Sequence, residues 1–169
     1  IAANYVASHF QQLGLSPAGD EGSYLQRIPL RRATLEPGSA RFVLARDGER
    51  RSFRFVDEFF MGPSKAHMQS EVAADMVFAG SGIHAPALGY SDYEGLDVED
   101  RIVVTIRGMP QEFPSEEGAP CSNARDIARN AIERGAVGLV SIYTPRSQKR
   151  FAWERLESMV GMPSMGWLD

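Results

Sequence analysis

The sequence predicts an α+β fold, and three adjacent stretches are the basis of that prediction. Ile102–Ile106 is an unbroken β-branched run and Ala136–Tyr143 is a second apolar run, so both have the character of strands buried on two faces. Between them, apolar residues recur at the spacing of one helix face: Ala124, Ile127, Ala128, Ala131 and Ile132. We therefore expect a strand, a helix and a second strand that lies next to the first.

The chain before this core begins with a predicted amphipathic helix over residues 1–15, with Gly14 just past its end. Tyr24–Leu30 is expected to be a strand interrupted at Pro29. Asp47-Gly48 then separates two strand-like runs, 41–45 and 52–56, which predicts a β-hairpin with some extra loop.

The hairpin region is rich in arginine. Its eight arginines outnumber three acidic residues: Arg27, Arg31, Arg32, Arg41, Arg46, Arg50, Arg51 and Arg54 against Glu36, Asp47 and Glu49. The region could be an anion or nucleic-acid patch, the solvated face of a hairpin, or a surface that meets an acidic partner domain. Because no exposed aromatic ladder is interleaved and the whole chain carries a net charge of −4, neither nucleic acid nor an anionic membrane is expected as a partner.

A domain boundary is expected near Ser70, because residues 57–70 have the irregular composition of a connector. This gives a first domain of residues 1–69 and a second of residues 70–169. In the second domain, a strand is expected at 74–80, a loop at 82–89 and an acidic turn at 90–100. Ser122 is the expected N-cap of the core helix, and Gly135 is expected to end it.

The remaining C-terminal part is less regular. Residues 144–148 are polar and basic, 151–160 could be a short helix or a loop, and 162–168 are expected to form a last strand that starts at Pro163. Both ends of the sequence are expected to be cut from something longer.

Composition places the chain among folded proteins. It has 169 residues, of which 43% are hydrophobic and 24% charged, which is ordinary for a globular chain with a core. Cys121 is the single cysteine, so an internal disulfide is impossible. No apolar run approaches the ~18 residues that a membrane span requires.

The sequence contains no recognisable catalytic or metal-binding motif. Its three histidines, His9, His67 and His84, are far apart and belong to no zinc-ligand pattern. Ser81, His84 and Asp92 could form a triad on paper, but spacing alone is a weak argument.

Two further features could suggest chemistry. Glu116 and Glu117 are adjacent carboxylates, but they lie in a Pro- and Ser-rich loop and are interpreted as solvated acids. Cys121 precedes the expected helix and is interpreted as structural or incidental. An independent hydrolase that uses Ser81 or Cys121 is therefore the weakest hypothesis.

Two parts of the chain resemble known families. Tyr93–Gly108, with its Arg-Ile-Val-Val-Thr-Ile-Arg-Gly strand, and Arg134–Tyr143, with Gly-Ala-Val-Gly, together resemble the protease-associated (PA) domain. Ala2–Gly19, followed by Tyr24–Leu30, looks like the opening of zinc-dependent aminopeptidases of the glutamate-carboxypeptidase-like class. In those enzymes a PA domain is inserted into the peptidase domain after its first helix and strands.

The resemblance implies a PA-type β-sandwich or open barrel with flanking helices, preceded by a helix and hairpin segment. It also implies a non-catalytic fragment of a secreted or periplasmic zinc exopeptidase, whose zinc ligands and general base lie further along the parent chain. The implied partners are the catalytic domain of that chain and a peptide substrate. The alternative is a free-standing PA module that binds peptides or proteins.

The resemblance implies that the loop from Arg107 to Asn123 faces the substrate or partner. Its candidate residues are Arg107, Gly108, Ser115, Glu116, Ser122 and Asn123. Residues 119–123 contain no arginine, unlike the arginine-rich stretch that precedes this helix in the glutamate-specific members of the family. An acidic substrate is therefore not implied.

Overall fold

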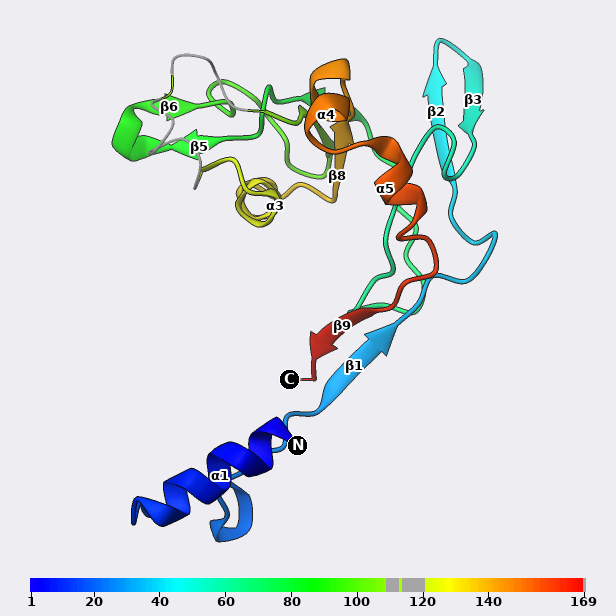
Figure 1. Ribbon diagram of the computed structural model, residues 1–169. Coiled ribbons are helices and arrows are strands. Elements are labelled where there is room, and N and C mark those ends of the chain that lie inside the picture. The colour runs from blue at the N-terminus through cyan, green and yellow to red at the C-terminus, as the bar shows by residue number, and fades with distance from the viewer. Residues whose placement is uncertain (109–112, 114–120, 169) are drawn as a thin grey trace. The chain divides into compact units, whose positions relative to one another are not determined.

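The computed structural model describes residues 1–108, 113 and 121–168. The chain forms two compact units, Ile1–Met68 with Gly161–Asp169, and Gln69–Val160 (Figure 1). Each unit mixes helices with small sheets, and the described strands form no closed barrel. The fold is therefore of the α+β type in general terms.

The first unit begins with helix α1, Ala2–Gln12, which ends before Gly14 in the left-handed conformation (φ 69°). Strand β1, Leu30–Ala33, pairs antiparallel with β9, Ser164–Trp167. The expected strand at 24–30 is wrong, because the ladder starts only at Leu30. Pro29 has no N–H to donate, although its carbonyl still accepts a 3.1 Å hydrogen bond from the Leu168 amide.

The last strand also differs from the expected grouping. The sequence places residues 162–168 in the second domain with the rest of 70–169, but β9 pairs with β1 of the first unit. The pairing joins segments on either side of the second unit in the sequence, which local patterns do not report.

The hairpin consists of β2, Phe42–Arg46, and β3, Glu49–Phe53, joined directly by Asp47 and Gly48. Both turn residues have positive φ, 51° and 82°, as a two-residue hairpin turn requires, so no extra loop is present. The rings of the cross-strand partners Phe42 and Phe53 lie 4.9 Å apart between centroids.

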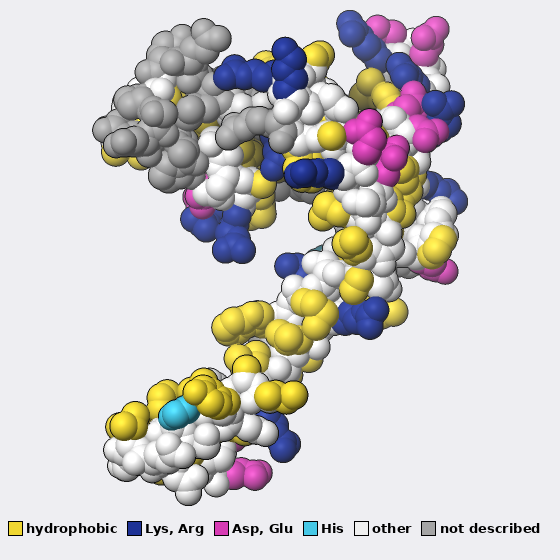
Figure 2. Space-filling view, viewed as in Figure 1, with side chains coloured by type: hydrophobic (Ala, Val, Ile, Leu, Met, Phe, Trp, Pro, Cys, Tyr) yellow, Lys and Arg dark blue, Asp and Glu magenta, His cyan; other side chains and the backbone are white. Residues whose placement is uncertain are grey.

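Acidic side chains partly neutralise the arginines of the hairpin. Arg51 forms an ion pair with Glu58 at 3.0 Å, and Arg54 forms one with Asp57 at 3.1 Å. Of these side chains, those of Arg51, Arg54 and Asp57 are mostly exposed to solvent. Figure 2 shows basic and acidic side chains interleaved over this region. The arrangement favours a solvated hairpin face over an anion-binding patch.

The second unit is built on a three-stranded parallel sheet with strand order β4–β7–β8. The strands are Met76–Phe78, Ile102–Ile106 and Gly138–Ile142, and helix α3, Ala124–Ile132, connects the last two. The strand–helix–strand prediction is therefore confirmed, including the adjacency of the two strands, which pair from Ile102↔Gly138 to Ile106↔Ile142. Gly135 has φ 81° just past the helix, as expected.

Short elements replace the loop and turn expected between 82 and 100. His84–Ala85 (β5) and Tyr90–Ser91 (β6) form an antiparallel pair, with a 3₁₀ turn, η2, at Pro86–Leu88 between them. After β8, the chain forms the short helices α4, Pro145–Arg150, and α5, Trp153–Glu157. A further 3₁₀ turn, η1, lies at Asp20–Gly22 in the first unit.

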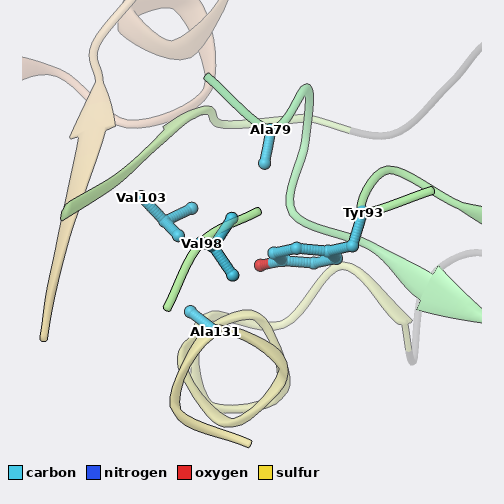
Figure 3. Packing of buried hydrophobic residues seen from close by; sticks show 5 residues of the cluster. All are labelled: Ala79, Tyr93, Val98, Val103 and Ala131. Atoms are coloured by element: carbon cyan, nitrogen blue, oxygen red, sulfur yellow. The ribbon is translucent and has the colours of Figure 1, made fainter. Parts of the chain in front are cut away.

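The core lies between the parallel sheet, α3 and the segment that precedes β7. It is formed by Ala79, Tyr93, Val98, Val103 and Ala131 (Figure 3). The apolar stripe of α3 is narrower than expected, because Ile127 and Ala131 are buried whereas Ile132 is 69% exposed. Every buried side chain in the described residues belongs to this second unit.

Candidate functional site

The candidate site is the carboxyl edge of the parallel sheet. In open sheets with parallel strands and helical crossovers, ligands bind where the strands end and the following helices begin. Arg107 and Gly108 directly follow β7, and Ser122 and Asn123 directly precede α3. Arg107 and Asn123 are exposed, whereas Gly108 and Ser122 are half-buried. The other two candidates, Ser115 and Glu116, lie outside the described residues.

Asn123, rather than the expected Ser122, is the N-cap of α3. Its side-chain oxygen accepts hydrogen bonds from the amides of Arg125 (3.1 Å) and Asp126 (3.0 Å), and its side-chain nitrogen contacts the Asp126 carboxylate. Asn and Ser are comparable caps by propensity, so the choice between adjacent positions depends on which one takes the extended backbone conformation. The cap uses the amides that an anion would otherwise bind.

A turn of three residues, Gly80-Ser81-Gly82, follows β4 and is held by Asp92. One oxygen of the Asp92 carboxylate accepts hydrogen bonds from the backbone amides of Ser81 (3.1 Å) and Ile83 (2.9 Å). The other oxygen accepts a 2.7 Å hydrogen bond from the Tyr90 hydroxyl. The Gly80 carbonyl in turn accepts from the Ile106 amide at 2.8 Å, so the turn is tied to the end of β7.

The structure does not bring Ser81, His84 and Asp92 together as a triad. The imidazole Nδ1 of His84 lies 3.1 Å from the Ser91 hydroxyl, its cross-strand neighbour. Asp92 bonds to backbone amides and to a tyrosine, and Ser81 reaches it through the backbone amide. A nucleophile–base–orienter chain requires the base to contact the nucleophile and the carboxylate, and neither contact is present here among the described residues.

The other two histidines make local contacts. The His9 ring lies edge-on to Tyr5 in α1, with 4.4 Å between centroids, and the His67 amide donates to the Ser64 hydroxyl at 3.0 Å. Cys121 is half-buried. Within residues 1–108, 113 and 121–168, no three His, Cys, Asp or Glu side chains converge as a metal ion would require.

The environment of Tyr93 does not follow from the sequence. Its side chain is 6% exposed and its hydroxyl has no hydrogen-bond partner among the described residues. Burial raises the pKa of the Tyr93 phenol, and the nearby Asp92 carboxylate raises it further, while the Arg134 guanidinium lowers it. That guanidinium lies 4.6 Å from the centre of the ring. An acidic turn around Tyr93 gave no signal that this side chain enters the core.

A second missed contact involves Phe113. Its ring packs edge-on against Tyr90 of β6, with 4.8 Å between centroids and an interplanar angle of 80°. Tyr90 therefore contacts the Phe113 ring with its own ring and the Asp92 carboxylate with its hydroxyl.

In the described part of the chain, no helix combines the length and the apolar character that crossing a bilayer demands. Comparisons with protein-family models, with curated proteins and with solved structures find no match to this chain. A functional interpretation therefore has to be argued from the topology and the side chains.

Proposed function

We propose that this chain is the non-catalytic N-terminal and PA-type part of a secreted or periplasmic zinc-dependent exopeptidase of the aminopeptidase kind. In this proposal, the unit Gln69–Val160 covers the active-site cleft of a catalytic domain in the same parent chain and shapes the access of peptide substrates. The observation that carries the proposal is the pairing of β1 with β9. The chain leaves the first unit after Met68 and returns at Gly161, which is the topology of an inserted domain.

The first unit supports this proposal through what it leaves exposed. Tyr5 and Phe10 of α1 are 65% and 41% exposed, Leu13 at its C-terminal end is 74% exposed, and Trp167 of β9 is 75% exposed. A two-stranded ribbon is marginally stable by itself, and a short helix draws most of its stability from packing of its apolar face. A catalytic domain that packs on these apolar residues would give the first unit the core that its own described residues lack.

The second unit suits the role of a cover because its parallel sheet and α3 pack around a common core and form a fixed scaffold. The sheet and α3 hold both ends of the connection between Arg107 and Asn123, and such connections on a rigid scaffold commonly carry binding residues. Zinc held by the catalytic domain would polarise the scissile carbonyl and activate a water molecule. Arg107 would contribute an exposed polar group at the edge that faces the substrate, and Asn123 would fix the start of α3 beside it.

The first experiment uses the chain of 169 residues itself. We expect it to fold, to bind no stoichiometric zinc by isothermal titration calorimetry, and to hydrolyse no aminoacyl p-nitroanilide. Tight zinc binding accompanied by turnover would refute the proposal. Thiol or hydroxyl active-site labelling of Cys121 or Ser81 with accompanying turnover would instead favour an independent hydrolase.

A second experiment tests the cover role in the encoded polypeptide. The coding sequence beyond Asp169 should contain a His-x-Asp motif followed by a Glu-Glu pair. Replacing residues 69–160 with a short Gly-Ser linker should leave hydrolysis of a small aminoacyl anilide within a few-fold and change the preference among peptides of different length. An unchanged length preference would contradict a role in substrate access.

The alternative is a free-standing module that binds peptides or partner proteins. The observation in its favour is a shallow apolar groove of about 190 Å³ between α3 and β8, lined by Ala128, Ala131, Ile132, Ala136, Val137, Gly138 and Leu139. A stop codon or a membrane segment soon after Asp169 would favour this module over the exopeptidase.

A further inference from the structure

Strand β8 is an open edge of the parallel sheet. Among the described strands it pairs with β7 alone, so one side of its backbone faces no other strand. The neighbouring strand shows which side this is. The Ile102 amide of β7 donates to the Asp75 carbonyl at 2.8 Å. The Val104 carbonyl of β7 accepts from the Ala79 amide at 2.9 Å, so the even-numbered residues of β7 bond toward β4.

The remaining residues of β7 bond to β8, because successive residues of a strand direct their backbone groups to opposite sides. With Ile102 opposite Gly138, the groups that β8 directs to β7 are those of its even-numbered residues. The N–H and C=O groups of Leu139 and Ser141 therefore point to the open edge. They have no hydrogen-bond partner within the part of the chain that the structure describes.

This edge lacks the sequence features that usually prevent strand pairing. Natural edge strands are protected by shortness, by charged residues or by proline. Residues 137–142 contain no charge and no proline, whereas β4 at the other edge of the sheet has only three residues. The side chains of Val137 and Ile142 are 42% and 44% exposed. An edge of this kind is a template for a further strand.

Charged side chains of opposite sign flank the two ends of β8. The acidic ones at the amino end are Glu99, Asp100 and Glu133, and the basic ones at the carboxyl end are Arg146 and Lys149. All are exposed, and no ion pair between described residues involves them. The Asp100 amide donates to the Gly135 carbonyl at 3.0 Å, and α4 follows β8 after a two-residue connection. Arg134, also near the amino end, is half-buried over the Tyr93 ring.

A second copy of this chain fits the edge in the antiparallel orientation. Pairing about a twofold axis places the amino end of one β8 beside the carboxyl end of the other, so the exposed acids of each copy meet the exposed bases of its mate. With the axis at Val140, Leu139 of each copy lies opposite Ser141 of the other, and these residues exchange both backbone hydrogen bonds. Ile142 then lies opposite Gly138, which has no side chain to obstruct it.

We propose that the β8 edges of two copies pair antiparallel and join their parallel sheets into one continuous sheet. The interface is isologous, so each contact occurs twice. It is also small, and the dimer is therefore weak. This inference goes beyond the proposed function, because it concerns the association of this chain with itself and needs neither zinc nor peptide hydrolysis.

Sedimentation equilibrium of the 169-residue chain tests the association. We expect the mass of a monomer at roughly 10 μM and that of a dimer at about 1 mM, as for a small transient interface. Glu133→Lys and Lys149→Glu should each weaken the association by roughly 2- to 30-fold, since each change breaks two symmetry-related exposed ion pairs. The double variant restores the opposite charges and should recover the association of the wild type.

Glu71→Lys is the matched control. It makes the same change in net charge at an exposed residue that precedes β4, at the other edge of the sheet, and it should leave the association unchanged. A monomer mass that persists at about 1 mM would overturn the proposal and leave the β8 edge to a strand of a different protein. Equal weakening by Glu71→Lys and Glu133→Lys would overturn it as well.

Amide hydrogen exchange locates the contact. In dilute solution the amides of Leu139 and Ser141 should exchange rapidly, whereas those of Val140 and Ile142, which bond to β7, should be protected. Protection at Leu139 and Ser141 should then rise together with the mass. A dimer in which these two amides keep their monomer rates would overturn the proposal. None of these measurements involves zinc or turnover, so failure of the proposed exopeptidase function and failure of this pairing are separate results.

Discussion

Replacing Tyr93 with phenylalanine removes one buried oxygen and little else. The side chain is 6% exposed, and its hydroxyl has no hydrogen-bond partner among the described residues (Figure 3). A buried polar group without a partner costs about 1–3 kcal/mol. Allowing for lost packing around the oxygen, we expect Tyr93→Phe to raise the free energy of unfolding of the second unit by about 1 kcal/mol.

Tyr90→Phe is the matched control, because it makes the same chemical change in the same unit. The Tyr90 hydroxyl donates to Asp92 at 2.7 Å, and a hydrogen bond to a charged group contributes about 1.5–3 kcal/mol. Since this pair is only partly buried, we expect a loss of about 1 kcal/mol. The two variants should therefore shift the unfolding free energy in opposite directions.

Urea unfolding followed by circular dichroism measures both effects. At an unchanged m-value, Tyr93→Phe should raise the urea concentration at the midpoint of unfolding. In thermal unfolding, a gain of about 1 kcal/mol corresponds to a rise in Tm of roughly 4–8 °C for a domain of 60–100 residues. A decrease in stability of more than about 0.5 kcal/mol would refute the reasoning, because it would mean that the hydroxyl has a partner, such as a buried water.

The pH dependence provides a further check of the same residue. Burial raises the pKa of Tyr93 in the folded state, so the folded chain binds more protons than the unfolded chain above the ordinary tyrosine pKa of about 10. The contribution of the Tyr93 proton to the free energy of unfolding is fully present below about pH 10, and it is lost as the pH rises through the pKa of the folded state. The stability difference between Tyr93→Phe and wild type should grow above about pH 10.

Three further predictions test the local geometry at Gly82, Asn123 and Glu58. Gly82→Ala should lower the free energy of unfolding in urea by about 2–5 kcal/mol, because φ is +72° and a Cβ would lie 2.9 Å from the methyl groups of two neighbours. Gly89→Ala, with φ +63° and open space around the Cβ, should lower it by about 1–2 kcal/mol. Equal losses in the two variants would contradict the packing at Gly82. Asn123→Ala should cost about 1 kcal/mol and Asn123→Ser only a few tenths, and identical losses would argue against capping. The pKa of Glu58 is lowered by the hydrogen bond from the Arg54 amide and then by the Arg51 guanidinium, so its stabilisation of the hairpin is present above the ordinary glutamate pKa and lost as the pH falls through the lowered value. The protection of amides near Glu58, measured against the exchange rate of an unstructured chain at the same pH, should fall in acid in the wild type and depend less on pH in Glu58→Gln.

Local sequence patterns predicted the elements whose signals lie within a few residues. The runs 102–106 and 136–143, the helical stripe between them and Asp47-Gly48 each carry their own period or turn chemistry, and each corresponds to an element of the structure. The candidate residues next to those elements, Arg107 and Asn123, could therefore be placed at the ends of β7 and α3 in advance.

The tertiary structure alone determined the contacts between segments that are far apart in the sequence. The β1–β9 ladder joins residues 30–33 to residues 164–167, and no local pattern encodes a partner at that separation. The burial of Tyr93 likewise depends on Ala79 after β4, Val103 of β7 and Ala131 of α3. The hydrogen bonds of Asp92 depend on the turn after β4, which supplies the amides of Ser81 and Ile83. An amphipathic pattern specifies which face of an element is apolar, whereas the residues that cover that face are chosen by the packing of the whole chain.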